Sequence, residues 1–427
     1  MNANARRVAV LGGIRIPFAR QNGPYARASN QDMLTATLEA LIARYSLQDE
    51  TLGEVAAGGV LKHSRDFNLT RESVLGTRLD PHTPAYDVQQ ACGTGLEAAI
   101  LVANKIALGQ IDSGIAGGFD TTSDAPIAVN EDLRQVLLGL GRAKTNAGRL
   151  KALSGLRPQQ VVPQIPRNAE PRTGLSMGEH AAIMAKEWGI TREEQDELAV
   201  SSHRNLAAAY DTGFLDDLVT PFLGLERDQN LRPDTSVEKL AKLKPVFGGA
   251  EGTMTAGNST PLSDGASAVL LASEDWAAAH NLPVLAYIAD AQTAAVDHVH
   301  AREGLLMAPT YAVPKLLERN NLTLQDFDHY EIHEAFASQV LCTLKAWEDP
   351  VYCKEKLGLD APLGSIDRDK LNTHGGSLAA GHPFGATGGR IVAALAKTLQ
   401  QKNGSSRGLI SICAAGGLGV TAIMEAA

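Results

Sequence analysis

The feature of this sequence that most restricts its fold is an order of elements that occurs twice. Residues 85–123 read as a strand, a tight turn at Cys92, a long apolar helix and a strand ending in Gly117-Gly118. Residues 375–427 repeat that order, with a glycine-rich turn, a long apolar helix and an apolar strand that ends in Gly-Gly. Strands alternating with helices are typical of α/β folds. The repetition therefore predicts an internal duplication, with the chain built from two related halves.

The stretch between these halves has a different character. From about Asp124 to Ser259 the strand signal is weak, and a helix is expected at 191–210, preceded by a capping box in which Glu194 follows Thr191 by three residues. We therefore predict that the middle is an insertion. The expected division is a first half formed by 1–123 and 261–282, an inserted, mostly helical loop domain at 124–260, and a second half at 283–427.

The insertion contains a basic island within an acidic chain. The net charge is −9, and such a chain is a poor candidate for a nucleic-acid binder. The island could face a phosphate-bearing ligand, a partner or a membrane, or it could be a solvated helical face, and the sequence leaves these roles open. The helix-like stretch Glu131–Leu156 mixes leucine and valine with basic residues, which suits a partner or a membrane. The island consists of Arg134, Arg142, Lys144, Arg149, Lys151, Arg157, Arg167 and Arg172.

Several classes of protein are disfavoured. No apolar run reaches about 18 residues, so no membrane span is expected, and Val8–Ile16 reads as a first strand rather than a signal peptide. The same stretch lacks the GxGxxG of a dinucleotide-binding dehydrogenase. None of the cysteines forms a CxxC pair, so we expect reduced thiols, no metal site and a cytoplasmic protein. The four are Cys92, Cys342, Cys353 and Cys413.

Glycine is frequent and aromatic residues are scarce. The chain has 41 glycines, and aromatics make up 5% of it. The core is therefore expected to consist of small aliphatic residues, with backbones packed closely and their N–H groups accessible for chemistry.

Two cysteines and two histidines stand at turns or strand ends, where α/β proteins bind ligands. Cys92 lies at the start of a helix, and we expect the helix dipole and free N–H groups to lower its thiol pKa. His382 lies in the second glycine-rich turn and is the candidate base for that thiol. His333 follows the strand expected at 329–332, and Cys413 ends an apolar strand. The duplication would bring the two glycine-rich turns face to face. Cys342 and Cys353 have no such setting and read as structural.

Five segments together resemble the signature blocks of thiolases, in the order of that family and across nearly the whole chain. The resemblance is to the 3-ketoacyl-CoA thiolases of bacterial fatty-acid-oxidation complexes and to β-subunits of trifunctional proteins. It implies duplicated βαβαβαββ halves in a five-layered α-β-α-β-α arrangement. The blocks are ACGTGLEA at 91–98, GTMTAGNSTPLSDGASA at 252–268, HEAFASQ at 333–339, GGSLAAGHPFGATG at 375–388 and CAAGGLG at 413–419.

The resemblance also implies roles for the reactive residues. Cys92 matches the acyl-accepting nucleophile, His382 its base, and Cys413 the second cysteine, which acts as acid and base. His333 stands where many thiolases have an asparagine that holds a water in an oxyanion hole, and here the imidazole is expected to donate directly. The backbone N–H groups of Cys92 and Ala415 are expected to hold a second oxyanion. Further residues match positions that line the CoA and acyl pocket, namely Met177, Ala256, Thr260 and Phe336.

The function implied by the resemblance is thiolytic cleavage of a 3-ketoacyl-CoA by CoA in fatty-acid β-oxidation, with ping-pong kinetics. CoA is then a co-substrate, and no metal or permanently bound cofactor is expected. A homodimer or dimer of dimers is expected, with an α-subunit that carries hydratase and dehydrogenase activities and a membrane surface as further candidate partners. The alternatives are an acetoacetyl-CoA thiolase working in the synthetic direction and another condensing enzyme, such as a ketosynthase. A ketosynthase would lack the second acid/base cysteine, and the complete Cys/His set disfavours a non-enzymatic subunit.

Overall fold

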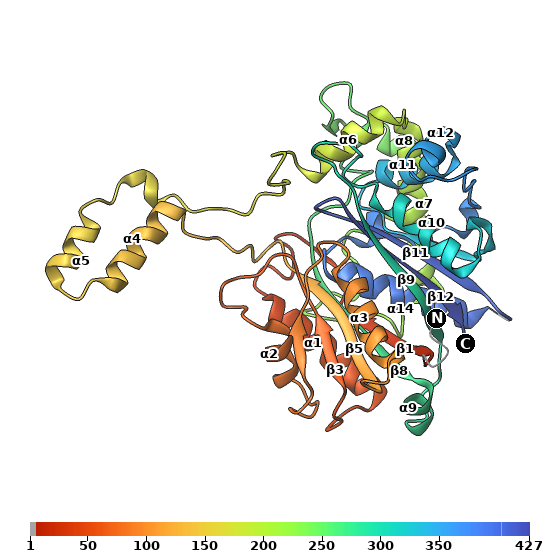
Figure 1. The fold of residues 1–427 in the computed structure, drawn as a ribbon, viewed down its shortest axis with the longest axis horizontal. Coiled ribbons are helices and arrows are strands. Elements are labelled where there is room, and N and C mark those ends of the chain that lie inside the picture. Colours follow the sequence, from red (N-terminus) through yellow and green to blue (C-terminus); the bar gives the residue numbers. More distant parts are fainter. Residues whose placement is uncertain (1–5, 403) are drawn as a thin grey trace.

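The two long apolar helices expected from the sequence contact each other at the centre of the molecule (Figure 1). The structure is a computed structural model that describes residues 6–402 and 404–427. Helix α3 spans Thr94–Ala107 and α14 spans Ala386–Gln401, and small residues line both. A Cβ atom on Gly388 would lie 2.1 Å from the backbone nitrogen of Leu96. The main chains of the two helices therefore touch directly, and no side chain separates them there.

The strands of both halves form one continuous ten-stranded sheet. The halves join where β1 pairs antiparallel with β9. The order β1-β8-β5-β3 in the first half corresponds to β9-β12-β11-β10 in the second. This matching order confirms the duplication. The strands are β1 (Val8–Arg15), β2 (Ala19–Arg20), β3 (Glu54–Ala57), β4 (Ala85–Asp87), β5 (Ser113–Asp120), β8 (Ser263–Ser273), β9 (Ala286–Ala295), β10 (His329–Ile332), β11 (Arg407–Ala414) and β12 (Leu418–Ala426).

Helices lie between the two halves of the sheet and on its outer faces. Helices α3 and α14 contact strands of both halves, α1 packs on the first half, and α10 packs on the second. This arrangement gives the predicted α/β class with five layers. The remaining elements of the first half are α1 (Asn30–Tyr45), α2 (Leu69–Leu75) and α9 (Glu274–Ala279). Those of the second half are α10 (Ala308–Asn320), η2 (Leu324–Asp326), α11 (Ala337–Glu348), α12 (Pro350–Glu355), η3 (Arg368–Lys370) and α13 (Ser377–Ala380).

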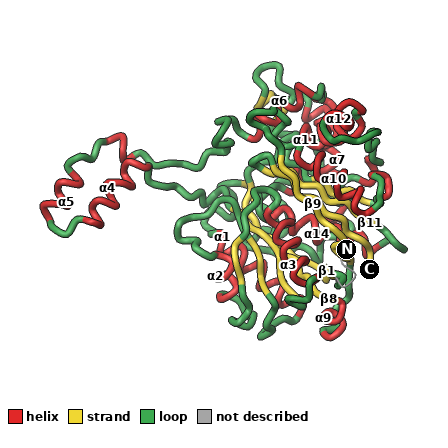
Figure 2. The backbone as a smooth tube through the Cα atoms, in the orientation of Figure 1, coloured by secondary structure: helices red, strands yellow, loops and turns green. Residues whose placement is uncertain are grey.

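The middle of the chain has two structurally different parts. The first is a helical hairpin on two long loops that projects from the body (Figures 1 and 2). The stretch expected to be one helix-like segment at 131–156 is two helices, α4 (Glu131–Arg142) and α5 (Asn146–Leu153), and neither has a buried residue. The second part packs on the body, and its helix α7 has the predicted capping box. Its elements are α6 (Met177–Glu187), α7 (Arg192–Asp211), α8 (Val237–Leu240), β6 (Pro245–Phe247) and β7 (Met254–Thr255). The short helix η1 (Pro158–Val161) has no buried residue and contacts α4, so it belongs to the projecting part.

Within residues 6–402 and 404–427, no helix is both long enough and apolar enough to cross a membrane.

Candidate active site

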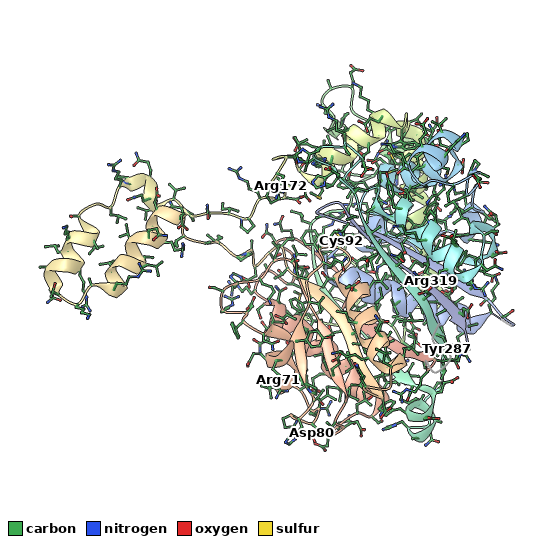
Figure 3. The ribbon with its side chains drawn as sticks, viewed as in Figure 1. Arg71, Asp80, Cys92, Arg172, Tyr287 and Arg319 are labelled. Carbon is green, nitrogen blue, oxygen red and sulfur yellow. The ribbon has the colours of Figure 1, made fainter. Side chains whose placement is uncertain are left out.

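The first reactive residue, Cys92, stands on a tight turn between β4 and α3. Ala91 has a φ of 48°, in the left-handed region, which costs an L-residue about 1–2 kcal/mol. The Thr94 hydroxyl holds the turn, because it donates to the carbonyl of Ala91 at 2.7 Å and accepts the N–H of Gln90 at 2.9 Å. Figure 3 shows Cys92 where the two halves meet, with Arg172 at the base of the projecting hairpin. The turn therefore presents a half-buried thiol to the opposite half.

The second reactive residue, His382, follows the short helix α13 in the other half. Gly381, before it, has a φ of 103°, a conformation that favours glycine. The Nε2 atom of His382 lies 3.1 Å from Sγ of Cys92. Its Nδ1 atom lies 2.6 Å from Oγ1 of Thr387, in the first turn of α14. The structure thus brings the predicted nucleophile and base into contact across the junction of the two halves.

Burial controls the charge of this pair. It raises the pKa of the Cys92 thiol to about 12, although the backbone N–H groups of Ala415 and Cys92 act in the opposite direction. The predicted lowering of the Cys92 pKa is therefore wrong, because desolvation of the thiolate outweighs the nearby donors. Burial, followed by the charge of Arg390, lowers the pKa of His382 to about 3. At neutral pH the resting pair is a thiol beside a neutral imidazole.

The third reactive residue, His333, is fully buried next to His382. Their ring centres are 4.2 Å apart. The Nδ1 atom of His333 lies 3.0 Å from Oγ of Ser377, while its Nε2 atom has no hydrogen-bond partner among the described residues. Burial lowers the pKa of His333 well below its usual value, and His382 and Arg390 lower it further. This imidazole is thus neutral, with one nitrogen held and the other free.

The second cysteine, Cys413, lies near the end of β11 and is 1% exposed. Burial raises the pKa of its thiol well above the usual value, and the neighbouring Cys92 adds to that rise. Cys413 and Cys92 line the same cavity of about 270 Å³. Three of the four predicted pocket residues line this cavity as well, together with His382 and Ala415. They are Met177, Thr260 and Phe336.

The fourth predicted pocket residue, Ala256, lies elsewhere. It lines a second cavity, of about 710 Å³, whose wall carries Arg20, Arg232 and Lys239. A third cavity, of about 540 Å³, opens beside Cys92 and is lined by apolar side chains that include Leu61 and Ile165. The second and third cavities share Leu262 with the one that holds the two cysteines. A basic region and an apolar region therefore approach the thiol from different directions.

The basic island contributes little to these cavities. The hairpin projects from the body (Figure 1), and of the eight island residues only Arg167 lines the cavity beside Cys92. The cations around the 710 Å³ cavity instead come from the first half and from the part of the middle segment that packs on the body.

One cluster among the described residues has the character of a metal site. The ligand atoms of Cys92, His333 and His382 lie within 4.8 Å of one another. Sulfur and imidazole nitrogen suit a soft cation such as Zn²⁺ better than Mg²⁺. The same atoms are those placed for thiol and imidazole chemistry, so we assign no resident metal.

The sequence argument missed two side chains that hydrogen-bond the reactive histidines, Ser377 and Thr387, and a third, Arg390, that hydrogen-bonds Ser377. Ser377 and Thr387 lie within the block at 375–388, and Arg390 follows it by two residues. Their contacts depend on how the turns fold, and spacing alone does not reveal them. The one available signal was the presence of hydroxyl residues within five positions of His382.

Comparison with known proteins agrees with this geometry. The family models for the thiolase N-terminal and C-terminal domains match residues 8–275 and 282–426. The chain is 40% identical to a 3-ketoacyl-CoA thiolase of Pectobacterium carotovorum over 98% of this chain and 96% of the relative. A thiolase of the same name from Yersinia pestis is 39% identical, over 98% and 97% of the two chains.

Solved structures give the same result. The human mitochondrial 3-ketoacyl-CoA thiolase superposes with a TM-score of 0.81 at 28% identity, covering 100% of both chains. The acetyl-CoA acetyltransferase of Bacillus anthracis superposes with a TM-score of 0.82 at 28% identity and the same coverage. Both family models, the near full-length relatives and the shared fold lead to one conclusion: the chain belongs to the thiolase family.

Proposed function

We propose that this protein cleaves a 3-ketoacyl-CoA with CoA, giving acetyl-CoA and an acyl-CoA two carbons shorter. The observation that carries the proposal is the contact between Nε2 of His382 and Sγ of Cys92 in a cavity shared with Cys413. The names of the relatives, 3-ketoacyl-CoA thiolases, support this reaction over synthesis of acetoacetyl-CoA.

In the first half-reaction His382 takes the proton of the Cys92 thiol, and the thiolate attacks C3 of the substrate. With Nδ1–H of His382 donating to Thr387, Nε2 is the nitrogen that accepts this proton. The bond between C2 and C3 then breaks, which leaves an acyl thioester on Cys92 and the enolate of acetyl-CoA. The thiol of Cys413 protonates C2 of the enolate, and acetyl-CoA departs.

In the second half-reaction the Cys413 thiolate takes the proton of the CoA thiol. The CoA thiolate attacks the acyl thioester, and Cys92 leaves as a thiolate that recovers its proton from His382. Backbone N–H groups of Cys92 and Ala415 stabilise the oxyanion of this step, since both already face the Cys92 sulfur. A donor of this kind contributes about 3–4 kcal/mol to a transition state.

Stabilisation of the enolate falls to His333 and His382. Both rings are buried and neutral at rest, and once His382 has taken the Cys92 proton it too presents an N–H at Nε2, while His333 remains neutral. A neutral N–H donor in a desolvated site stabilises a developing negative charge more strongly than the same donor in water. His333 is the better placed of the two for this role, because its Nε2 atom is not engaged by another residue of the described chain.

CoA is proposed as co-substrate, with no permanently bound cofactor. The cations Arg20, Arg232 and Lys239 on the 710 Å³ cavity support binding of its phosphates, and Ala256 and Ser259 line the path toward the thiol. A solved complex of the human mitochondrial 3-ketoacyl-CoA thiolase with CoA, at 29% identity, is consistent with this assignment. The 540 Å³ cavity, lined by Leu61, Ile165 and other apolar groups, is proposed for the acyl chain.

The hairpin is proposed as the contact with a further macromolecule, either an α-subunit or a membrane surface. Several large apolar side chains on it are exposed beside basic ones, and such a surface on a projecting element is unusual without a partner. We also propose that the protein is a homodimer or a dimer of dimers, and that 124–260 functions as the insertion between two catalytic halves. The exposed apolar residues are Leu137, Leu138, Leu150 and Leu153.

The reaction is tested by measuring acetyl-CoA formation from 3-ketoacyl-CoAs of four to sixteen carbons, with and without CoA. We expect CoA-dependent cleavage, parallel double-reciprocal lines and an acyl group on Cys92 detectable by mass spectrometry. Absence of CoA-dependent cleavage at every chain length would overturn the proposal. The same series establishes the chain-length preference.

A further inference from the structure

A buried arginine lies behind the two histidines. Arg390, on α14, is 7% exposed, and its Nη2 atom donates to Oγ of Ser377 at 3.2 Å. The carboxyl groups of Glu331 and Glu334 are the acidic groups that act most strongly on it. Burial raises the pKa of Glu331 to about 7. The arginine is therefore the cation of a largely desolvated cluster directly behind the reactive rings.

The Ser377 hydroxyl connects this arginine to His333. Its oxygen has two hydrogen-bond partners in the described parts of the chain, Nη2 of Arg390 and Nδ1 of His333. A guanidinium has no lone pair to offer, so it can only donate to Ser377. The hydroxyl proton then has one acceptor within reach, the Nδ1 atom of His333. A neutral imidazole that accepts at Nδ1 carries its proton on Nε2.

We propose that Ser377 and Arg390 are positioning residues that hold His333 as the Nε2–H tautomer, so that this N–H donates to the thioester oxygen of the departing enolate. This inference rests on the proposed function, because it gives the free nitrogen of His333 its role in that reaction. The other tautomer would turn a lone pair toward the enolate and repel it.

His382 has the opposite arrangement. Its Nε2 atom faces the thiol of Cys92, and its Nδ1 atom faces the hydroxyl of Thr387. A base must present a lone pair at Nε2, whereas an oxyanion donor must present a proton there. The base role of His382 thus requires its proton on Nδ1, next to Thr387, whereas the contacts of Ser377 place the proton of His333 on Nε2.

The charge of Arg390 adds to the effect of the tautomer. It lowers the pKa of both His333 and His382, so it disfavours an imidazolium at either ring. The same positive charge favours an anion on the far side of His333. Through His333 the cluster therefore supports the enolate of the first half-reaction, whereas the oxyanion of the second is held by backbone N–H groups.

The experiment compares the two half-reactions in Ser377→Ala. Release of acetyl-CoA from a 3-ketoacyl-CoA without free CoA reports the first, and exchange of labelled CoA into a saturated acyl-CoA reports the second. We expect the first to slow at least about 10-fold, because a wrong tautomer of a catalytic imidazole is costly, and the second to change less than about two-fold. Equal loss in both would overturn the proposal.

Ser267→Ala is the matched control for a lost buried hydrogen bond. The Ser267 hydroxyl, on β8, donates to the carbonyl of Ala386 on α14, the helix that carries Arg390. It hydrogen-bonds neither histidine in the described structure. If loss of any buried hydroxyl group near α14 were enough to slow the first half-reaction alone, this variant would show the same selective slowing. We expect the ratio of the two half-reactions to stay that of the wild type.

A double-mutant cycle with His333→Asn separates the tautomer from general structure. An asparagine amide has N–H donors that no tautomer can remove. Ser377→Ala is therefore expected to slow the first half-reaction in the wild type and to change it less than about two-fold in the His333→Asn background. An undiminished loss in that background would show that Ser377 acts otherwise than through His333.

The proton itself can be located without any activity measurement. Neutron diffraction or ¹⁵N imidazole shifts of the wild-type protein are expected to place it on Nε2 of His333 and to show a mixed population in Ser377→Ala. A proton found on Nδ1 of His333 in the wild type would refute the inference even in an active thiolase. A protein with the proton on Nε2 but without thiolytic activity would instead refute the proposed function.

Discussion

The imidazole rings of His333 and His382 lie with their centres 4.2 Å apart and their planes tilted by 48°. One follows a strand and the other a short helix, so separate parts of the second half place them side by side. Both are buried, and a charge on one raises the free energy of a charge on the other. Burial makes even the first additional proton costly, since it lowers the pKa of His382 to about 3. The pair can therefore hold one additional proton but not two, and it holds the proton of Cys92 only while the acyl-enzyme is formed and consumed.

Replacing Cys92 by alanine is expected to abolish thiolysis, with a loss in kcat of at least about 1,000-fold, because Cys92 is the thiol that hydrogen-bonds His382 in the described structure. Steady-state rates and mass spectrometry for an acyl-enzyme provide the measurement. Cys353→Ala is the control: that thiol is buried away from the site and bonds the carbonyls of Ala346 and Trp347. Near-normal turnover by the Cys92 variant would contradict the assignment.

Alkylation of Cys92 by iodoacetamide is expected to accelerate steadily from pH 6 to above pH 9. Burial raises the pKa of this thiol to about 12, so the reactive thiolate remains a minor species that increases with pH. Peptide mapping of the alkylated protein identifies the residue. A rate that is already constant near pH 7 would indicate a thiolate–imidazolium pair at rest.

The unfolding midpoint is expected to fall as the pH drops below about 6.5. Burial lowers the pKa of His374 and of His203 to about 4. Each is therefore neutral in the folded state while the unfolded chain takes up a proton, and stability is lost between pH 6.5 and about 4. For each histidine, the free energy of unfolding decreases by at most about 1.4 kcal/mol per unit of pH lowered.

A variant at one of these histidines checks that prediction. His374→Phe keeps a ring for stacking on Phe214, which lies 3.6 Å away centre to centre, and removes the titrating group. The variant is expected to lose less stability than the wild type between pH 7 and pH 5 in parallel thermal unfolding series. An unchanged pH dependence would assign the acid sensitivity to other groups.

Gly388→Ala is expected to destabilise the protein by about 3 kcal/mol or more, since the new methyl group would overlap backbone atoms that cannot move aside. Its Cβ would lie 2.1 Å from the nitrogen of Leu96. Gly141→Ala is the control, because nothing lies within 4 Å of a Cβ at that position in α4, and it should be neutral or slightly stabilising. Thermal unfolding of both variants compares the two sites.

Replacing residues 131–153 with a short glycine-serine linker is expected to leave kcat/KM within about two-fold, since neither hairpin helix has a buried residue. The full chain should sediment with anionic vesicles or bind a candidate α-subunit, and the shortened chain should do neither. Equal binding by both chains would show that the hairpin is not the contact with an α-subunit or a membrane.

Much of the fold was predictable from periodicity. The repeated order of turn, helix and strand predicted the duplication, and the capping residues Thr191 and Glu194 located the start of α7. The break between α4 and α5 was not found, because both helices are exposed and their residues show no burial pattern that marks an end.

The reactive residues of the site were predictable from the sequence, but their pKa values and hydrogen-bond partners were not. Cys92, His382, His333 and Cys413 stand at turns and strand ends that a reader of the sequence can locate. The raised pKa of Cys92 was missed because it depends on how completely the opposite half covers the thiol. Ser377 and Arg390 were missed for a related reason, since their contact with each other and with His333 exists only after α13 and α14 have packed.

The direct contact between the main chains of α3 and α14 has a consequence for how such an enzyme can diversify. Cys92 and His382 stand just before these two helices, and their spacing depends on backbone atoms that no ordinary side-chain substitution alters. The apolar walls around Leu61 and Ile165 lie outside that contact. The residues of those walls can be substituted during evolution, or redesigned for bulkier or branched acyl groups, while the distance between the thiol and the imidazole is kept.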